Sequence, residues 1–189
     1  MKTLIFNGSP RPDGNTSFLI DELRSVLEGE TVVVNAYTAN VAPCIDCREC
    51  WDSYGCIIHD GMDEIYGHIF AADAIVIASP VYNCELTPPL LGIFSRLQSF
   101  YAALRFLGVR LIPKGRFGAV VLTGGGDGSS AKAESSAKMF LRHMGAPSKA
   151  LVTSLKTDSL LACEDDRAIE EIHALGNMIN ELAKSKYEE

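Results

Sequence analysis

The sequence lacks an excess of basic residues and has no long hydrophobic run. Its 17 lysines and arginines are outnumbered by 24 aspartates and glutamates, which gives a formal net charge of −7 at pH 7. A general nucleic-acid binder needs a basic face for phosphate contacts, so the charge argues against that class. No uninterrupted apolar stretch approaches the ~18 residues of a membrane-spanning helix, so we expect no membrane partner.

The N-terminal residues also lack the features of a secretory signal peptide. The apolar segment 3–6 is too short for the hydrophobic region of a signal peptide and runs into a glycine turn without a small-residue cleavage site. We therefore expect a cytoplasmic protein. With 47% hydrophobic and 22% charged residues, the chain has the composition of one globular domain over residues 1–189, with no linker or internal repeat.

Apolar segments of strand length alternate with segments of helical period about five times. The runs 74–78 and 119–122 are continuously apolar, which is typical of strands covered on both faces. This alternation predicts a three-layer α/β fold, with a parallel sheet between two layers of helices and right-handed crossovers. The expected strands are 3–6, 31–35, 74–79, 117–123 and 149–154. The expected helices are 16–27, 62–72, 88–107, 131–144 and 165–184.

The loop after the first expected strand, residues 7–17, is rich in hydroxyl and amide groups and leads into a helix. Ligands of open parallel sheets bind beyond the carboxyl ends of the strands, and a helix N-terminus attracts anions. Arg11 adds a charge that can fork onto a phosphate. The Walker-loop lysine is missing, so we do not expect nucleoside triphosphate hydrolysis. We favour phosphate binding over a plain turn in which Asn15 or Ser17 caps the helix.

Two further strand ends carry segments suited to a planar ligand. Residues 79–83 read Ser-Pro-Val-Tyr-Asn, where proline fixes the chain direction and Tyr82 offers a flat face. Taken alone, this segment is explained equally well as an ordinary strand exit. Residues 123–126 read Thr-Gly-Gly-Gly, and glycines let a backbone approach a ligand closely. Their register does not match the dinucleotide fingerprint, so we interpret them as one wall of a ligand crevice.

Four of the six cysteines lie within thirteen residues, in a cysteine-rich loop at about 43–61. Cys44, Cys47, Cys50 and Cys56 have the spacing C-x2-C-x2-C-x5-C. Disulfides explain this cluster poorly, because the chain has neither a secretory leader nor the small size of a stapled scaffold. The spacing suits the corners of an iron–sulfur cluster. Structural zinc and a metal-free thiol loop remain as alternatives.

Taken in order, these segments resemble the NADPH-dependent FMN reductase superfamily, which is flavodoxin-like, and within it the iron–sulfur flavoproteins. The resemblance covers about the first two thirds of the chain. It implies a flavodoxin-like three-layer sandwich with five parallel strands in the order 2-1-3-4-5. The FMN phosphate ligands it implies are Ser9, Arg11, Asn15, Thr16 and Ser17. The residues it places beside the flavin ring are Pro80, Val81, Tyr82 and Asn83 on one side, and Thr123, Gly124 and Gly125 on the other.

The same resemblance implies a [4Fe–4S] cluster on the four clustered cysteines. We expect an FMN-dependent oxidoreductase that passes electrons from a reduced donor, NAD(P)H or an electron carrier, to a small acceptor. NAD(P)H would dock transiently, since no second nucleotide-binding domain is visible. The alternatives are a cluster-free FMN, quinone or azo reductase and a non-enzymatic electron carrier. No side chain is an obvious acid or base, so no catalytic residue is named. Relatives are commonly dimers or tetramers, so we expect a homodimer or homotetramer.

Overall fold

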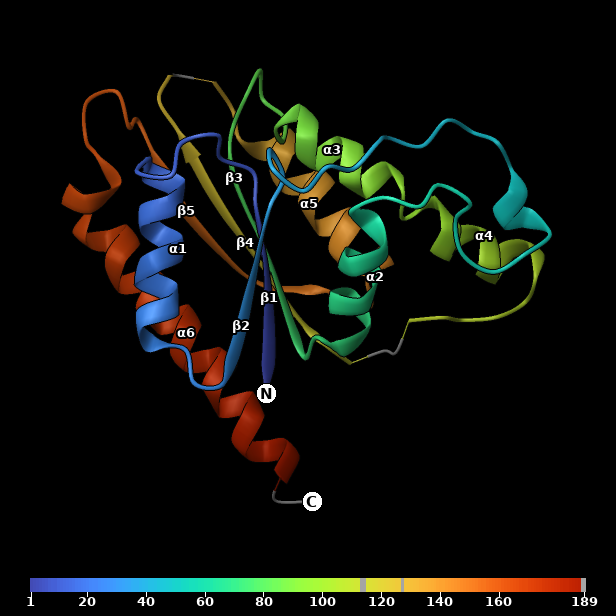
Figure 1. Ribbon diagram of the computed structural model, residues 1–189. Helices are drawn as coiled ribbons and strands as arrows, with labels where there is room; N and C mark the ends of the chain where they lie inside the picture. The colour runs from blue at the N-terminus through green and yellow to red at the C-terminus, as the bar shows by residue number, and fades with distance from the viewer. Residues whose placement is uncertain (113–114, 127, 188–189) are drawn as a thin grey trace.

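A five-stranded parallel sheet forms the centre of the protein (Figure 1). The computed structural model describes residues 1–112, 115–126 and 128–187, with the backbone alone for 183–187. Its strands run in the order β2-β1-β3-β4-β5, which confirms the predicted flavodoxin-like fold. The strands are β1 (Lys2–Asn7), β2 (Glu30–Asn35), β3 (Ala74–Pro80), β4 (Phe117–Gly124) and β5 (Ser148–Leu155).

Helices cover both faces of this sheet (Figure 1). Those of the described residues are α1 (Asn15–Val26), α2 (Met62–Ala71), α3 (Pro88–Ser95), α4 (Gln98–Phe106), α5 (Ala131–His143) and α6 (Asp166–Tyr187). Helices α1 and α6 pack on one face, where Leu23 and Ile172 share an apolar cluster with Val76 of the sheet. Helices α2, α3 and α5 cover the opposite face. Within the described chain, no helix is long and apolar enough to cross a membrane.

The central strands β3 and β4 are buried along almost their whole length. In β3 only Pro80 is partly exposed, and in β4 only Gly124. Ile75 joins the apolar cluster on one face of the sheet, whereas Val76 joins the cluster on the other. Both faces of each strand are therefore covered, which confirms what the continuous apolar runs predicted.

One predicted helix is in fact two. The sequence predicted a single helix over 88–107, but α3 ends at Ser95 and α4 begins at Gln98. At the break, the backbone N–H of Arg96 donates to the Ile93 carbonyl at 3.0 Å. This bond spans three residues, as in a 3₁₀ helix, instead of the four of an α-helix. The Arg96 side chain is fully buried there. The partners of this side chain lie far away in the sequence, so the local sequence pattern could not predict the break.

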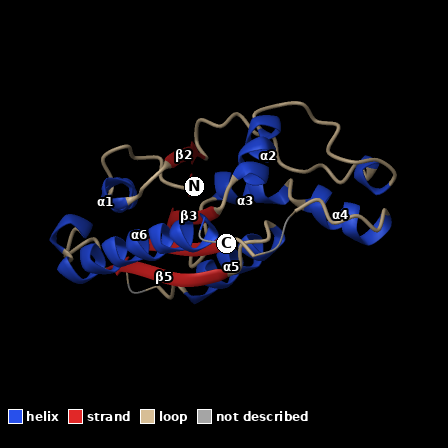
Figure 2. Ribbon diagram, turned by 90° about the horizontal axis from the view of Figure 1, so that it is seen from below, coloured by secondary structure: helices blue, strands red, loops and turns tan. Residues whose placement is uncertain are grey.

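The cysteine loop and α4 extend together to one side of the sheet, as Figures 1 and 2 both show. A short 3₁₀ helix, η1 (Glu49–Trp51), is the regular element of this loop. The Trp51 ring stacks on Phe106 of α4, with ring centroids 4.3 Å apart. The Arg48 guanidinium lies 4.9 Å from the Trp51 ring, on which it can make a cation–π contact. Aromatic packing thus holds the outer part of the loop on α4.

Candidate functional site

The loops that leave β1, β3, β4 and β5 meet at the carboxyl edge of the sheet around a cavity of about 190 Å³. Of the twelve residues predicted to contact FMN, ten line this cavity. They are Ser9, Arg11, Asn15, Thr16, Pro80, Val81, Tyr82, Thr123, Gly124 and Gly125. Ser17 and Asn83 are the two that do not line it. The fold therefore brings together three segments that are far apart in the sequence, as the resemblance implied.

The loop after β1 is organised around the Ser9 hydroxyl. The Ser9 Oγ accepts the backbone N–H of Arg11 at 3.1 Å and lies 3.2 Å from the Arg11 carbonyl. The backbone N–H of Ser9 itself donates to Asn7 Oδ1 at 2.8 Å. Gly14 is the N-cap residue of α1, and no described side chain makes a capping hydrogen bond there. A helix N-terminus without a side-chain cap is suited to bind an anion, and Arg11 lies beside it.

Three of the predicted phosphate ligands also make structural hydrogen bonds. The Ser17 hydroxyl donates to the Arg11 carbonyl at 2.7 Å. Asn15 Oδ1 accepts the backbone N–H of Ala162 at 2.9 Å, which ties α1 to the short helix η2 (Ala162–Glu164). The hydroxyls of Thr16 and Thr123 lie 2.7 Å apart and join α1 to the end of β4. These bonds fix the walls of the cavity before any ligand enters.

The exit of β3 forms a two-residue turn beside the cavity. Tyr82 and Glu85 exchange backbone hydrogen bonds of 2.9 and 3.0 Å. Between them, Asn83 and Cys84 have φ angles of +51° and +64°. Each non-glycine residue in this left-handed conformation costs about 1 kcal/mol. Such strain is typical of ligand-binding loops. Tyr82 is 42% exposed on the cavity wall, and Asn83 is not among the residues that line the cavity.

The loop after β5 supplies two cavity residues that the sequence reasoning missed, Thr157 and Asp158. The backbone N–H of Thr157 donates to the Gly124 carbonyl at 2.9 Å. The Asp158 side chain lies against Gly125 so closely that a Cβ at position 125 would stand 2.2 Å from Oδ1. All parallel strands present their carboxyl ends at the same edge, so this rule applied to the fifth strand would have found the loop.

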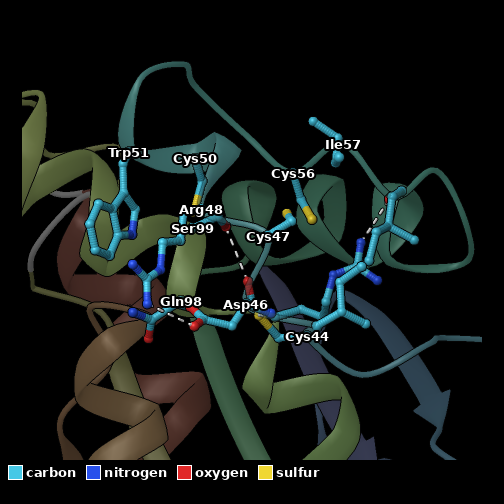
Figure 3. Close-up of a pocket in the computed structure, with 13 residues that line it drawn as sticks. Cys44, Asp46, Cys47, Arg48, Cys50, Trp51, Cys56, Ile57, Gln98 and Ser99 are labelled. Carbon is cyan, nitrogen blue, oxygen red and sulfur yellow. Dashed lines mark hydrogen bonds and ion pairs between the residues drawn. The ribbon is translucent and has the colours of Figure 1, made fainter.

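The four clustered cysteines line a second, smaller cavity between the cysteine loop and the α3–α4 break (Figure 3). Cys44 and Cys47 are exposed, whereas Cys50 and Cys56 are half-buried, and all four are free thiols. Trp51, Arg96 and Ser99 complete part of the lining. Among the described residues, none lines both this cavity and the one at the carboxyl edge of the sheet.

The donor chemistry of this second cavity fits a metal–sulfur group. Four thiols are the ligand set of a [4Fe–4S] cluster and also of structural zinc. Burial, together with the charges of the other three cysteines, raises the pKa of Cys50. The backbone N–H of Asp46 points at Cys44 Sγ at 3.5 Å. In the part of the chain that the structure describes, however, no three Cys, His, Asp or Glu side chains converge in a metal-binding arrangement.

Comparison with known proteins gives a family and several relatives. The sequence model of the NADPH-dependent FMN reductase family matches residues 1–154. An iron–sulfur flavoprotein of Methanocaldococcus jannaschii is 40% identical over 85 residues, which are 43% of this chain and 44% of that protein. An iron–sulfur flavoprotein of Methanosarcina thermophila is 38% identical over 99 residues, 51% of this chain and 52% of that one. The chain spans about half the length of these curated relatives.

Solved structures show the same fold. The FMN-dependent NADH-azoreductase of Bacillus anthracis, crystallised in complex with FMN, superposes with a TM-score of 0.71. The superposition covers 95% of this chain and 100% of the azoreductase, at 20% sequence identity. At this identity the likeness establishes the fold alone.

Proposed function

Because the chain belongs to the NADPH-dependent FMN reductase family, we propose that it is a flavin-dependent oxidoreductase with FMN in the cavity at the carboxyl edge of the sheet. Electrons pass from NAD(P)H or a reduced carrier to a small acceptor. One observation carries the proposal: the loop after β1, proposed for the phosphate, and the loops after β3 and β4, proposed for the ring, line a single cavity although together they span more than a hundred positions of the sequence. When bound, FMN supplies the hydride and one-electron chemistry.

The residues of the cavity bind and orient the flavin in this proposal. The N-terminus of α1, Ser9 and Arg11 hold the phosphate. Pro80–Tyr82 and the backbone at 123–125 border the ring. Ser17 contributes through its backbone N–H, because its hydroxyl is already bonded to the Arg11 carbonyl, whereas Asn83 is not among the residues that line the cavity. We assign no acid or base, since orientation of the donor over the ring suffices for hydride transfer.

We further propose that Cys44, Cys47, Cys50 and Cys56 hold a [4Fe–4S] cluster, which supplies one-electron transfer. The support is the set of four thiols around one cavity, together with relatives that are named iron–sulfur flavoproteins. We also propose a homo-oligomer, a dimer at least. Helix α4 leaves Tyr101, Leu104 and Phe106 between 43% and 48% exposed, which offers an apolar face to a second copy.

Flavin titrations test the proposed cavity. The dissociation constants of FMN and riboflavin are measured for the wild-type apoprotein, for Arg11→Met and for the matched control Arg24→Met, whose side chain lies on α1 near Asp21. A charged hydrogen bond is worth about 1.5–3 kcal/mol, so Arg11→Met should weaken FMN binding roughly ten- to a hundredfold. Riboflavin affinity should stay unchanged, because riboflavin has no phosphate. Equal losses for both flavins would contradict the placement of the phosphate.

Metal analysis and turnover separate the remaining alternatives. Protein purified without oxygen is assayed for iron, acid-labile sulfide, zinc and flavin per chain. Full flavin without iron would support the cluster-free reductase, and zinc in place of iron would support a structural metal. Steady-state oxidation of NAD(P)H with a quinone acceptor distinguishes an enzyme from a pure electron carrier, since a carrier turns over no small substrate.

A further inference from the structure

Arg96 is a buried cation whose hydrogen bonds reach both ends of the cysteine loop. Its side chain is 0% exposed. Nη1 donates to the Ala42 carbonyl at 2.9 Å and Nη2 donates to the Ile58 carbonyl at 2.7 Å. Ala42 precedes the first clustered cysteine, and Ile58 follows the last. One guanidinium thus closes the base of the loop 42–58, which contains all four cysteines.

Asp60 is the charged partner of this closure. Its Oδ2 accepts from Arg96 Nη1 and from the backbone N–H of Ala42, both at 2.9 Å. Its Oδ1 accepts the backbone N–H of Met62 at 2.9 Å, at the start of α2. Burial raises the pKa of Asp60, but the hydrogen bonds from Met62, Ala42 and Arg96 outweigh burial and hold the pKa below its ordinary value. The carboxylate therefore stays charged and compensates the buried guanidinium.

The backbone at Arg96 is also held in place, and the side chain of the neighbouring Ser95 contacts the loop. The Tyr66 hydroxyl donates to the Arg96 carbonyl at 2.8 Å, and the Ser99 hydroxyl donates to it at 3.1 Å. The neighbouring Ser95 Oγ accepts the backbone N–H of Cys44 at 2.9 Å. The backbone of the α3–α4 break is therefore fixed by hydrogen bonds, and the base of the cysteine loop is hydrogen-bonded to the Ser95 side chain at this break.

One nitrogen atom of the Arg96 guanidinium has no acceptor among the described residues. This atom is Nε, which is buried. Arg96 also lines the cavity of the four cysteines. An unpaired buried donor costs about 1–3 kcal/mol, and because Arg96 lines the cavity of the thiols, a group bound in that cavity is the candidate acceptor for Nε.

We propose that Arg96 is the positioning residue of the cysteine loop: it closes the loop at its base and offers a buried positive charge and a free Nε–H to the metal–sulfur group that the four thiolates hold. The proposal rests on the proposed cluster. A group ligated by four thiolates is anionic, and the reduction potentials of such groups respond to nearby charge and to hydrogen bonds to the sulfurs. We therefore expect Arg96 to affect both the amount of iron that the loop binds and the reduction potential of the bound group.

The test compares Arg96→Met and Arg96→Lys with the matched control Arg116→Met. Arg116 is a second buried arginine, and it donates to the carbonyls of Ile69 and Phe70 at the C-terminal end of α2, away from the cysteine loop. Hydrogen exchange of the amides of residues 42–58 is measured in metal-free protein. Iron and sulfide per chain, and the midpoint potential, are measured after anaerobic reconstitution with ferrous iron and sulfide.

Arg96→Met should speed exchange in 42–58 at least tenfold, lower iron loading and shift the potential of any loaded protein downward, because a lost positive charge disfavours the reduced state. Arg96→Lys should retain more iron than Arg96→Met, since it keeps the charge. Arg116→Met should lower overall stability and leave loop exchange and potential at wild-type values. The proposal would be overturned if Arg96→Met had the same amide exchange rates in 42–58 and the same iron content per chain as the wild type. If the wild type takes up no iron while loop exchange still depends on Arg96, the cluster fails and the loop closure stands.

Discussion

Single residues give the carboxyl edge of the sheet its shape. At Gly8, an added Cβ would stand 2.4 Å from Leu90 Cδ1, so glycine lets the loop after β1 lie directly against α3. The Thr87 hydroxyl donates to the Gly8 carbonyl at 3.0 Å and fixes this contact. At Gly125 the same kind of close approach leaves room for Asp158. Small side chains at these positions bring the walls of the cavity together.

Gly125→Ala should lower FMN affinity about tenfold, the size of one lost hydrogen bond to a ligand. The new Cβ would displace the Asp158 carboxylate, which lies 2.2 Å from it, and so deform the wall. Fluorescence titration of FMN measures the effect. Gly126→Ala is the control, because an added Cβ there meets none of the described residues within 4 Å beyond its chain neighbours. If both variants bind FMN as the wild type does, Asp158 has no part in shaping the site.

Asp60→Asn should destabilise the protein by about 3 kcal/mol at pH 7, because it leaves the buried Arg96 guanidinium without its countercharge. The folded-state pKa of Asp60 is lowered, so its contribution is present above the unfolded pKa of about 3.9. It is lost as the pH falls through the folded-state value. The free energy of unfolding in urea is measured for the wild type and Asp60→Asn between pH 7 and pH 3. The difference between the two proteins should be constant near neutral pH and become smaller in acid.

The exposed Asp21 provides the comparison for this measurement. Its side chain is 66% exposed and pairs only with the neighbouring Arg24 among the contacts of the described residues. Asp21→Asn should change the free energy of unfolding by less than about 1 kcal/mol at any of these pH values. A loss as large as that of Asp60→Asn would show that the effect is not specific to the buried pair.

Elements are joined in this molecule by close backbone contacts at their ends. In β4, a Cβ at Gly118 would stand 2.0 Å from the Ala146 carbonyl, just before β5 begins. The pairing of β4 and β5 shifts register at this point, between Gly118 and Ala119. The glycine therefore permits the irregular start of this strand pair, as glycines in strands commonly do.

Gly118→Ala should cost more than about 2 kcal/mol in the free energy of unfolding, because a backbone carbonyl cannot move aside as a flexible side chain does. Gly67→Ala is the matched change in a helix, where an added Cβ has no contact within 4 Å in the part of the chain that the structure describes. It should stabilise the protein by roughly 0.5–1 kcal/mol, since alanine favours the helical backbone. Urea denaturation of the three proteins gives both values.

The whole molecule should respond to FMN as a single cooperative unit, because the cavity joins segments from β1, β3, β4 and β5. A ligand at one hundred times its dissociation constant stabilises the folded state by about 2.7 kcal/mol. For a chain of this size, that corresponds to a rise in melting temperature of about 5–10 °C. Thermal melts with saturating FMN measure it. Arg11→Met at the same FMN concentration should show a smaller rise, and an equal rise would contradict the role of Arg11.

The sequence by itself determined the layers, the strand positions and the segments that meet at the carboxyl edge. The physical reason is that a strand covered on both faces must be apolar at every position, as in 74–78, and that glycine and hydroxyl residues are needed where a chain turns closely beside a helix start. These requirements concern neighbouring residues in the sequence, so local sequence patterns can predict them.

Tertiary contacts alone decided the remaining features. The break between α3 and α4 coincides with the burial of Arg96, whose partners Ala42 and Asp60 lie 54 and 36 positions away. Asp158 enters the cavity because β5 happens to end beside β4. Asn15 is bonded to Ala162 across 147 positions. Local sequence patterns cannot predict such pairs, because the two partners are distant in the sequence and come into contact only in the folded chain.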